Sequence, residues 1–198
     1  MNASTNVLTH ALTIDTVKPG ALAAMQEAAK ADGSPSRSLV GCWTNEFGKL
    51  NQLYRLWRVE GEAAGLSALE RPDVLLNREE RLLRQQRPTV ESNEGPFYYE
   101  LRSYQMHAGR VNEFVGLLLA HMELRETWSK CMGLWLPLNG DMSEVIHLWP
   151  YRDLAHRAQT RATSAAHPVW DAYRRRVLPM IAGQTSVLLS PTLHSRLR

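Results

Sequence analysis

Cysteine is scarce in this sequence, and the signatures of several common enzyme classes are missing. The 198 residues include two cysteines, Cys42 and Cys131, which are too few for a disulfide framework or a four-cysteine zinc site. We expect both to pack as small apolar side chains. No Gly-x-Gly-x-x-Gly, P-loop, Gly-x-Ser-x-Gly or His-Glu-x-x-His motif occurs. Nucleotide-dependent chemistry, triad hydrolysis and zinc catalysis are therefore without support, and we predict neither a cofactor nor a metal.

Long apolar runs are also missing. The longest one, near residues 115–120, is far shorter than the about 20 residues that span a bilayer. No Lys or Arg precedes Lys18, so the start of the sequence is unlike a secretory signal or an Arg-rich transit peptide. We therefore expect a cytoplasmic protein without a membrane partner.

The charge is nearly balanced and gives no reason to expect a nucleic-acid partner. The net charge is +3, and the one basic run lies at residues 174–176. No aromatic residues interleave with this run to stack on bases. We interpret it as the solvated face of a helix.

Glycine and tryptophan recur with a fixed spacing, which indicates an internal repeat. The positions Gly41, Trp43, Gly48, Leu56 and Trp57 recur 92 residues later as Gly133, Trp135, Gly140, Leu148 and Trp149. Matches in one register at five positions indicate a tandem duplication. We predict a diverged N-terminal repeat over residues 1–92 and a C-terminal repeat over residues 97–192, joined by a turn-rich linker around residues 89–96.

Each half has the pattern of a ferredoxin-like unit. In the second half, apolar periodicity predicts a strand at 98–106, a helix at 111–122, strands at 131–137 and 143–149, a helix capped by Asp153 that Pro168 interrupts, and a strand at 185–189. In the first half it predicts strands at 7–16, 39–45 and 52–59, helices at 21–31 and up to about residue 86, and a last strand for which only 87–91 remains. The order is βαββαβ.

The fold prediction follows from how such units are covered. A four-stranded sheet with helices on one face leaves its other face bare, and two units in one chain can pack their bare faces together. We therefore predict an α+β fold in which two tandem ferredoxin-like βαββαβ repeats form a pseudo-twofold α/β barrel of the dimeric type. Edge strands that remain in each half invite pairing with another chain, so we also expect a homo-oligomer, most simply a dimer.

Alternation along the central strands sorts their side chains into two faces. The side chains that we predict to face the helices are aliphatic, namely Leu12, Ile14, Leu56, Leu101, Ile146 and Leu148. The opposite face carries the group that we call the polar-aromatic cluster: Glu100, Arg102, Tyr104, His147 and Trp149. We expect this cluster to lie between the two sheets, with Arg55 and Trp57 of the first half opposite it.

Two interpretations of the polar-aromatic cluster stay open. In the first, Arg102, Tyr104 and His147 are catalytic: the arginine binds an anionic or enolate oxygen, and the histidine and tyrosine serve proton transfer and anion stabilisation. The side chains that would then bind the substrate are Glu100, Trp149, Trp135, Tyr151, Arg161, Trp57 and Arg55. In the second, Glu100 and Arg102 neutralise each other within a structural core.

The motifs of the second half resemble those of the NIPSNAP family. They are Tyr99-Glu100-Leu101-Arg102-Ser103-Tyr104, Gly109, Gly133, the run His147-Leu148-Trp149-Pro150-Tyr151-Arg152-Asp153-Leu154, Arg157, Arg161 and Trp170. The resemblance covers residues 98–192 and implies the fold of the dimeric α/β-barrel superfamily. It implies little about chemistry, because the family has no generally established reaction. Superfamily relatives include cofactor-free monooxygenases, isomerases and haem proteins, which is an analogy of fold.

These observations lead to competing functional hypotheses. The first is that the protein binds or transforms a small aromatic or polyketide-like molecule in an α/β-barrel pocket without a nucleotide cofactor. The alternative is a non-catalytic interaction or adaptor module whose barrel interior is structural. Haem binding is a third hypothesis and needs an axial ligand. An open pocket at the cluster would favour the first hypothesis, and a filled interior the second.

Overall fold

The computed structural model describes residues 9–28, 37–59, 71–90, 95 and 97–197. The described elements of the first half are β1 (Thr9–Val17), α1 (Leu22–Ala28), β2 (Arg37–Asn45), β3 (Gln52–Val59) and β4 (Leu75–Gln85). Those of the second half are β5 (Tyr98–Met106), α2 (Val111–Ala120), α3 (Met122–Glu126), β6 (Gly133–Pro137), β7 (Glu144–Tyr151), α4 (Leu154–Ala166), α5 (Pro168–Val177), the 3-10 helix η2 (Leu178–Met180) and β8 (Ile181–Pro191). The second half therefore has the predicted order of strands and helices.

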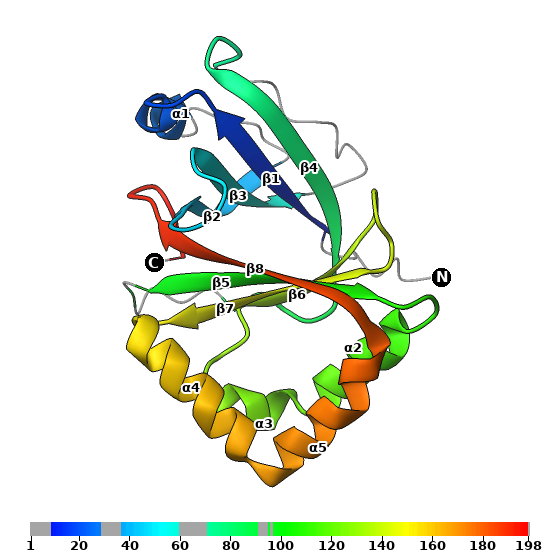
Figure 1. Cartoon of the computed structure of the whole chain (residues 1–198). Helices are drawn as coiled ribbons and strands as arrows, with labels where there is room; N and C mark the ends of the chain where they lie inside the picture. Colours follow the sequence, from blue (N-terminus) through cyan, green and yellow to red (C-terminus); the bar gives the residue numbers. More distant parts are fainter. Residues whose placement is uncertain (1–8, 29–36, 60–70, 91–94, 96, 198) are drawn as a thin grey trace, which may run out of the picture.

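The strands close into one antiparallel barrel, which confirms the predicted α+β barrel fold (Figure 1). The strand order is β4-β1-β3-β2 in the first half and β8-β5-β7-β6 in the second. The first and third strands are thus central in each sheet, as in a ferredoxin-like unit. Pairing of β2 with β8 and of β4 with β6 joins the two sheets. On this basis we propose that residues 1–92 and 97–192 are two repeats of one unit.

The last strand of the first half differs from its prediction. Helical spacing predicts a helix up to about residue 86, but residues 75–85 form β4, and residues 60–70 lie outside the described part of the chain. Among the described residues of β4, Leu83 alone is buried. The strand forms because it pairs along β1, where Arg78 Nε lies 2.5 Å from Asp15 Oδ1. Pairing between distant segments overrides the local pattern here.

Apolar side chains from both halves fill the barrel interior. They include the aliphatic residues Leu12, Ile14, Leu56, Leu101, Ile146 and Leu148. The prediction that these residues face the helices is therefore wrong: they face each other across the barrel, and the polar-aromatic cluster faces outward. A gap of about 10 Å³ lies among them, which is too small for a ligand.

The repeated Gly-x-Trp motifs belong to this interior. Trp43 and Trp135 are each 1% exposed, and each indole ring lies across the glycine two residues before it. A Cβ atom at Gly41 or Gly133 would lie 2.0 Å from the ring of that tryptophan. Trp135, which the sequence suggests as a substrate-binding residue, is thus a core residue of the barrel.

Helices α2 to α5 cover the outer face of the second sheet (Figure 1). Helix α2 buries Phe114, Val115 and Leu118 against that sheet. As predicted, Asp153 caps α4, because its carboxylate accepts a hydrogen bond from the backbone N–H of His156 at 2.6 Å. Proline 168 begins α5, where a missing N–H is tolerated.

Closure of the barrel removes the free sheet edges on which the expectation of a homo-oligomer rests. Within the described residues, the edges of the two sheets pair with each other in the same chain. A dimer stays a prediction, which light scattering would test. Of the helices in the described part of the chain, none is long and apolar enough to cross a membrane. The cytoplasmic location also stays a prediction.

Candidate functional site

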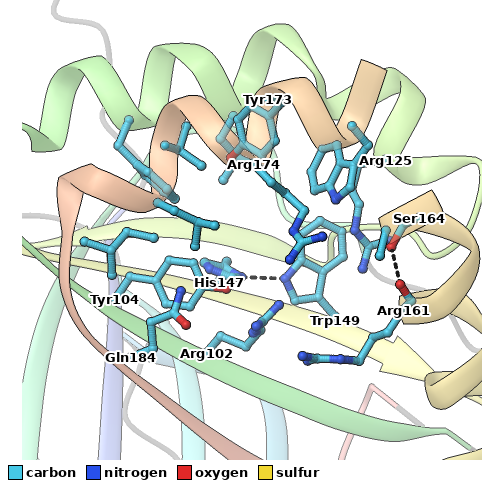
Figure 2. A pocket seen from close by; sticks show the side chains of 17 residues that line it. Arg102, Tyr104, Arg125, His147, Trp149, Arg161, Ser164, Tyr173, Arg174 and Gln184 are labelled. Carbon is cyan, nitrogen blue, oxygen red and sulfur yellow. Dashed lines mark hydrogen bonds between the residues drawn. The ribbon is translucent and has the colours of Figure 1, made fainter. Parts of the chain in front are cut away.

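A cavity of about 220 Å³ lies between the second sheet and helices α2, α4 and α5 (Figure 2). Strand β5 contributes Arg102 and Tyr104 to its wall, and β7 contributes His147 and Trp149. Four of the five members of the polar-aromatic cluster therefore meet at one cavity. The predicted position of the cluster between the two sheets is wrong, because its face of the second sheet turns toward the helices.

The lining of the cavity combines apolar side chains with positively charged ones. The apolar lining includes Phe114, Leu118, Trp170, Tyr173, Val177 and Ile181. The charged lining consists of Arg102, Arg125, Arg161 and Arg174. No aspartate or glutamate is among the described residues that line the cavity. Such a lining favours a ligand with an apolar body and a negative charge.

His147 is held in one protonation state by its neighbour on the strand. Its Nδ1 accepts a hydrogen bond from the indole Nε1–H of Trp149 at 2.5 Å. Because an indole N–H can only donate, the imidazole proton must lie on Nε2. Burial, followed by the charges of Arg102 and Arg125, lowers the pKa of His147 well below its usual 6.5. The ring is therefore neutral, and its Nε2–H is a buried donor that has no hydrogen-bond partner in the described part of the chain.

Arg102 lies beside His147, because the two residues are paired across β5 and β7. Its Nε is 3.9 Å from Glu100 Oε1 and makes no hydrogen bond within the described residues, although it is buried. The guanidinium carbon lies 5.1 Å from the ring centroid of Tyr104, and that ring packs edge-on against His147 with 4.7 Å between centroids. Burial raises the pKa of Tyr104, so its hydroxyl stays protonated.

Arg125 is a candidate that the sequence reasoning missed. It is 5% exposed, and its guanidinium carbon lies 4.1 Å from the ring centroid of Trp149. Its Nη2 donates to the hydroxyl of Tyr151 at 3.3 Å. Burial lowers the pKa of Arg125 and the partner Tyr151 opposes this change. Tyr151, a predicted substrate-binding residue, is thus a support for Arg125 behind the cavity wall.

Glu100 is fully buried and provides the counter-charge of this group of arginines. Its Oε1 accepts hydrogen bonds from Arg157 Nη2 at 2.6 Å and from Ser186 Oγ at 2.5 Å. It also lies 3.6 Å from Arg161 Nη1. Burial alone would raise the pKa of Glu100, but Arg157, Arg102 and Ser186 outweigh it and keep the pKa below its usual value. Glu100 therefore anchors α4 to β5 as a carboxylate and does not line the cavity.

Arg161 and Arg174 reach the cavity from α4 and α5 (Figure 2). The side chain of Arg161 is 47% exposed, so it stands where the cavity meets solvent. The interpretation of the basic run as a solvated face is right for Arg175 and Arg176, but Arg174 lines the cavity. The i, i+3, i+4, i+7 spacing of Trp170, Tyr173, Arg174 and Val177 could have placed Arg174 on the inner face of the helix.

Arg55 and Trp57 hold the equivalent positions in the first half and do not reach this cavity. Arg55 Nη2 donates to Asp15 at 2.5 Å, and Trp57 Nε1 donates to Thr13 at 3.3 Å. The prediction that they lie opposite the polar-aromatic cluster is wrong, because the two sheets turn these faces away from each other. In the described part of the first half, an ion pair between Arg55 and Asp15 thus stands where the equivalent residues of the second half border the cavity.

Comparison with known proteins adds the family. The NIPSNAP family model matches residues 99–196. The chain is 30% identical to Protein NipSnap homolog 2 of Danio rerio, over 81% of this chain and 62% of that protein. It therefore spans less than two thirds of that relative, as it does of the human NipSnap homolog 2.

Solved structures extend the comparison. An uncharacterized NIPSNAP domain protein from Burkholderia xenovorans is 32% identical, with a TM-score of 0.47 over 49% of this chain and 96% of that chain. An anthrone oxidase-like protein is 11% identical, with a TM-score of 0.69 over 95% of this chain and 92% of that chain. The latter likeness concerns the barrel fold alone.

Proposed function

Because this chain belongs to the NIPSNAP family, whose barrel fold here leaves a cavity under the helices, we propose that the cavity binds a small aromatic or polyketide-like molecule without a nucleotide cofactor. The proposal covers binding and the stabilisation of an oxygen anion that the bound molecule carries or forms. Arg102, Tyr104 and His147 are the residues that would contact this oxygen.

The proposal rests on the difference between the barrel interior and the space between the second sheet and its helices. The barrel interior is filled, with a gap of about 10 Å³. The polar-aromatic cluster instead borders a cavity of about 220 Å³ with buried polar groups on its wall. Buried donors without a hydrogen-bond partner among the described residues also occur in the filled interior, at Trp43 Nε1 and Trp135 Nε1, but those of the cluster belong to residues that border a space large enough for a ligand. Two such donors of the cluster, His147 Nε2 and Arg102 Nε, make no hydrogen bond in the described part of the chain and support a ligand-binding role.

His147 supports this function in a role different from the predicted one. Its Nδ1 is occupied by the Trp149 N–H, and its Nε2 carries the proton. In this state the imidazole donates to an oxygen and does not remove a proton from the substrate. The arrangement is suited to stabilising negative charge on oxygen, which is a large contribution in many enzymes.

The test is a calorimetric titration of the full chain with 2-naphthoate, a flat anionic probe. Two exposed alanines at the end of α4 provide matched variants: Ala165 lines the cavity, and Ala166 does not. We expect Ala165→Trp to obstruct the cavity and weaken binding at least tenfold. We expect Ala166→Trp to bind as the wild type does.

Equal affinity in all three proteins would place the probe elsewhere and contradict the proposal. Binding of neither 2-naphthoate nor its neutral amide to the folded wild type would contradict it as well. That second result would favour the interaction module, in which the cavity has no ligand.

A further inference from the structure

We infer that the polar end of the cavity is a carboxylate site built from N–H donors, in which Trp149 is a positioning residue that keeps His147 as a donor. The ligand class that follows is an aromatic carboxylate, in preference to a neutral aromatic molecule. This inference rests on the proposed function and makes its ligand specific.

Trp149 is the donor and His147 the acceptor of the hydrogen bond between them. The indole can only donate, so the geometry leaves one neutral tautomer, with the proton on Nε2. His147 lines the cavity, and this N–H is buried and lacks an acceptor within the described residues. A buried donor without an acceptor is unfavourable, and a ligand oxygen would satisfy it.

Arg102 Nε is a neighbouring donor that also lacks an acceptor in the described part of the chain. Arg102 Nε is buried, and its carboxylate neighbour Glu100 lies 3.9 Å away. Glu100 Oε1 accepts from Arg157 and Ser186, and Glu100 Oε2 makes no hydrogen bond with a described residue, so neither oxygen accepts from Arg102 Nε in this geometry. Arg102 and His147 are directly paired across two strands, so that one ligand group with two acceptor oxygens can serve both. A carboxylate has that shape and charge.

The cavity wall around these two donors is positively charged. Arg125, Arg161 and Arg174 line the cavity together with Arg102, and the described lining includes no acidic side chain. Figure 2 shows Arg102, Arg161 and Arg174 grouped around the dashed bond between His147 and Trp149. Glu100 lies near Arg102 and Arg161, but Arg125 and Arg174 have no carboxylate partner among the described residues. Arg125 is also 5% exposed, and a buried cation without a counter-charge is unfavourable. The electrostatics therefore select a negative charge.

The aromatic residues of the cavity wall indicate the shape of the rest of the ligand. Trp149, Trp170 and Tyr173 line the same cavity, and the last two rings are stacked at a tilt with 4.5 Å between centroids. Aromatic walls of this kind suit a flat ring, which can stack or meet them edge-on. An aromatic ring that carries a carboxylate can contact both kinds of group, the aromatic side chains and the N–H donors.

The indole N–H of Trp149 keeps the imidazole proton of His147 on Nε2, in addition to the space that the indole ring fills. Without its N–H, His147 Nδ1 could carry the proton, and Nε2 would become an acceptor that repels a carboxylate. Trp170 is the matched control, because it lines the same cavity and has no hydrogen bond to a histidine among the described contacts. Trp149→Phe and Trp170→Phe therefore remove rings of equal size, and only the first removes the donor to His147.

The binding test compares 2-naphthoate with 2-naphthamide, which has the same shape without the charge, in titrations of the full chain. We expect the wild type to prefer the carboxylate at least 30-fold. We expect Trp149→Phe to reduce this preference at least fivefold and Trp170→Phe to weaken both probes while keeping their ratio. Similar affinities of the wild type for the two probes would overturn the inference and leave the proposed function standing. Binding of neither probe would overturn both.

The second readout needs no ligand and does not depend on the folding of Trp149→Phe. Nitrogen-15 NMR of the imidazoles in the wild type, with His147→Gln to assign the signals, reports which nitrogen carries the proton. We expect neutral His147 with the proton on Nε2, and a mixture of tautomers in Trp149→Phe. A proton on Nδ1, or a charged ring, in the wild type at pH 7 would overturn the inference even if Trp149→Phe does not fold.

Discussion

His147 and Trp149 stand two positions apart on β7, so their side chains leave the strand on the same face. This spacing is visible in the sequence and is sufficient to group the two residues. The tautomer of His147 could not be predicted, because it depends on the orientation of the indole. The guanidinium of Arg125 packs on that indole from a separate helical segment, and sequence spacing carries no information about this contact.

His10 leads to a prediction about acid stability. It is fully buried, with its ring centroid 5.8 Å from that of Trp135, and burial followed by the charge of Arg58 lowers its pKa to about 4. The unfolded chain, with a histidine pKa near 6.5, binds the proton first. The stability due to neutral His10 is therefore complete above pH 6.5 and is lost as the pH falls toward 4. Between pH 7.5 and pH 5.0, this residue should lower the free energy of unfolding by about 2 kcal/mol.

Urea unfolding at these two pH values tests the prediction. In His10→Gln the side chain cannot titrate, so the loss of stability on acidification should be about 2 kcal/mol smaller than in the wild type. Acidification of His147 lowers stability in both proteins and cancels in this comparison. His107 is exposed, and His107→Gln should keep the wild-type loss. If the free energy of unfolding falls as much in His10→Gln as in the wild type between pH 7.5 and pH 5.0, then His10 is not a buried neutral group.

At the scale of elements, the Gly-x-Trp motifs of β2 and β6 require a residue without a side chain at the glycine position. Trp43 and Trp135 lie so close to Gly41 and Gly133 that an added Cβ atom would stand 2.0 Å from the ring. Both rings are packed in the core and cannot move aside freely. Gly41→Ala and Gly133→Ala should each lower the free energy of unfolding by about 1–3 kcal/mol, as overpacking of a core does.

The control for this pair is Gly116→Ala in α2, where an added Cβ atom would meet nothing within 4 Å. Replacing a helical glycine by alanine should raise the free energy of unfolding by about 0.5–1 kcal/mol. Urea unfolding of the three variants measures both effects. If Gly133→Ala is as stable as the wild type, the ring of Trp135 does not lie across its strand.

The elements differ in how well the sequence predicts them. Strands β3 and β5 have the predicted bounds, 52–59 and 98–106, and β5 also has the alternation of a strand. Strand β4 has charged residues at helical spacing, and its identity depends on pairing with β1 and β6, which are remote in sequence. Local periodicity contains the first kind of information and not the second.

At the scale of the whole molecule, the two halves share a barrel but differ on their outer faces. In the first half, Asp15 accepts hydrogen bonds from Arg55 and Arg78, which gives an ion-pair network. In the second half, His147 and Arg102 stand at positions equivalent to Arg55 and Thr13, and they border the cavity. The sequence shows this difference between the copies. We therefore assign the proposed binding function to the second half.

The position of the site could be predicted only in part, for a reason that also belongs to the whole molecule. Alternation correctly grouped Arg102, Tyr104, His147 and Trp149 on one face. Both faces of the second sheet are covered, one by the first sheet and one by helices (Figure 1), so alternation cannot say which face meets which layer. Apolar content does not decide it either, because the aliphatic face fills the barrel and the aromatic face packs under the helices.

We propose that the cavity under the helices holds an aromatic carboxylate against His147 and Arg102. The decisive experiment is a crystal structure of the full chain with bound 2-naphthoate. We expect the naphthalene ring among Trp149, Trp170 and Tyr173, with carboxylate oxygens about 3 Å from His147 Nε2 and Arg102 Nε. Naphthoate bound at another place, or in the cavity with its carboxylate turned away from these two donors, would refute the proposal.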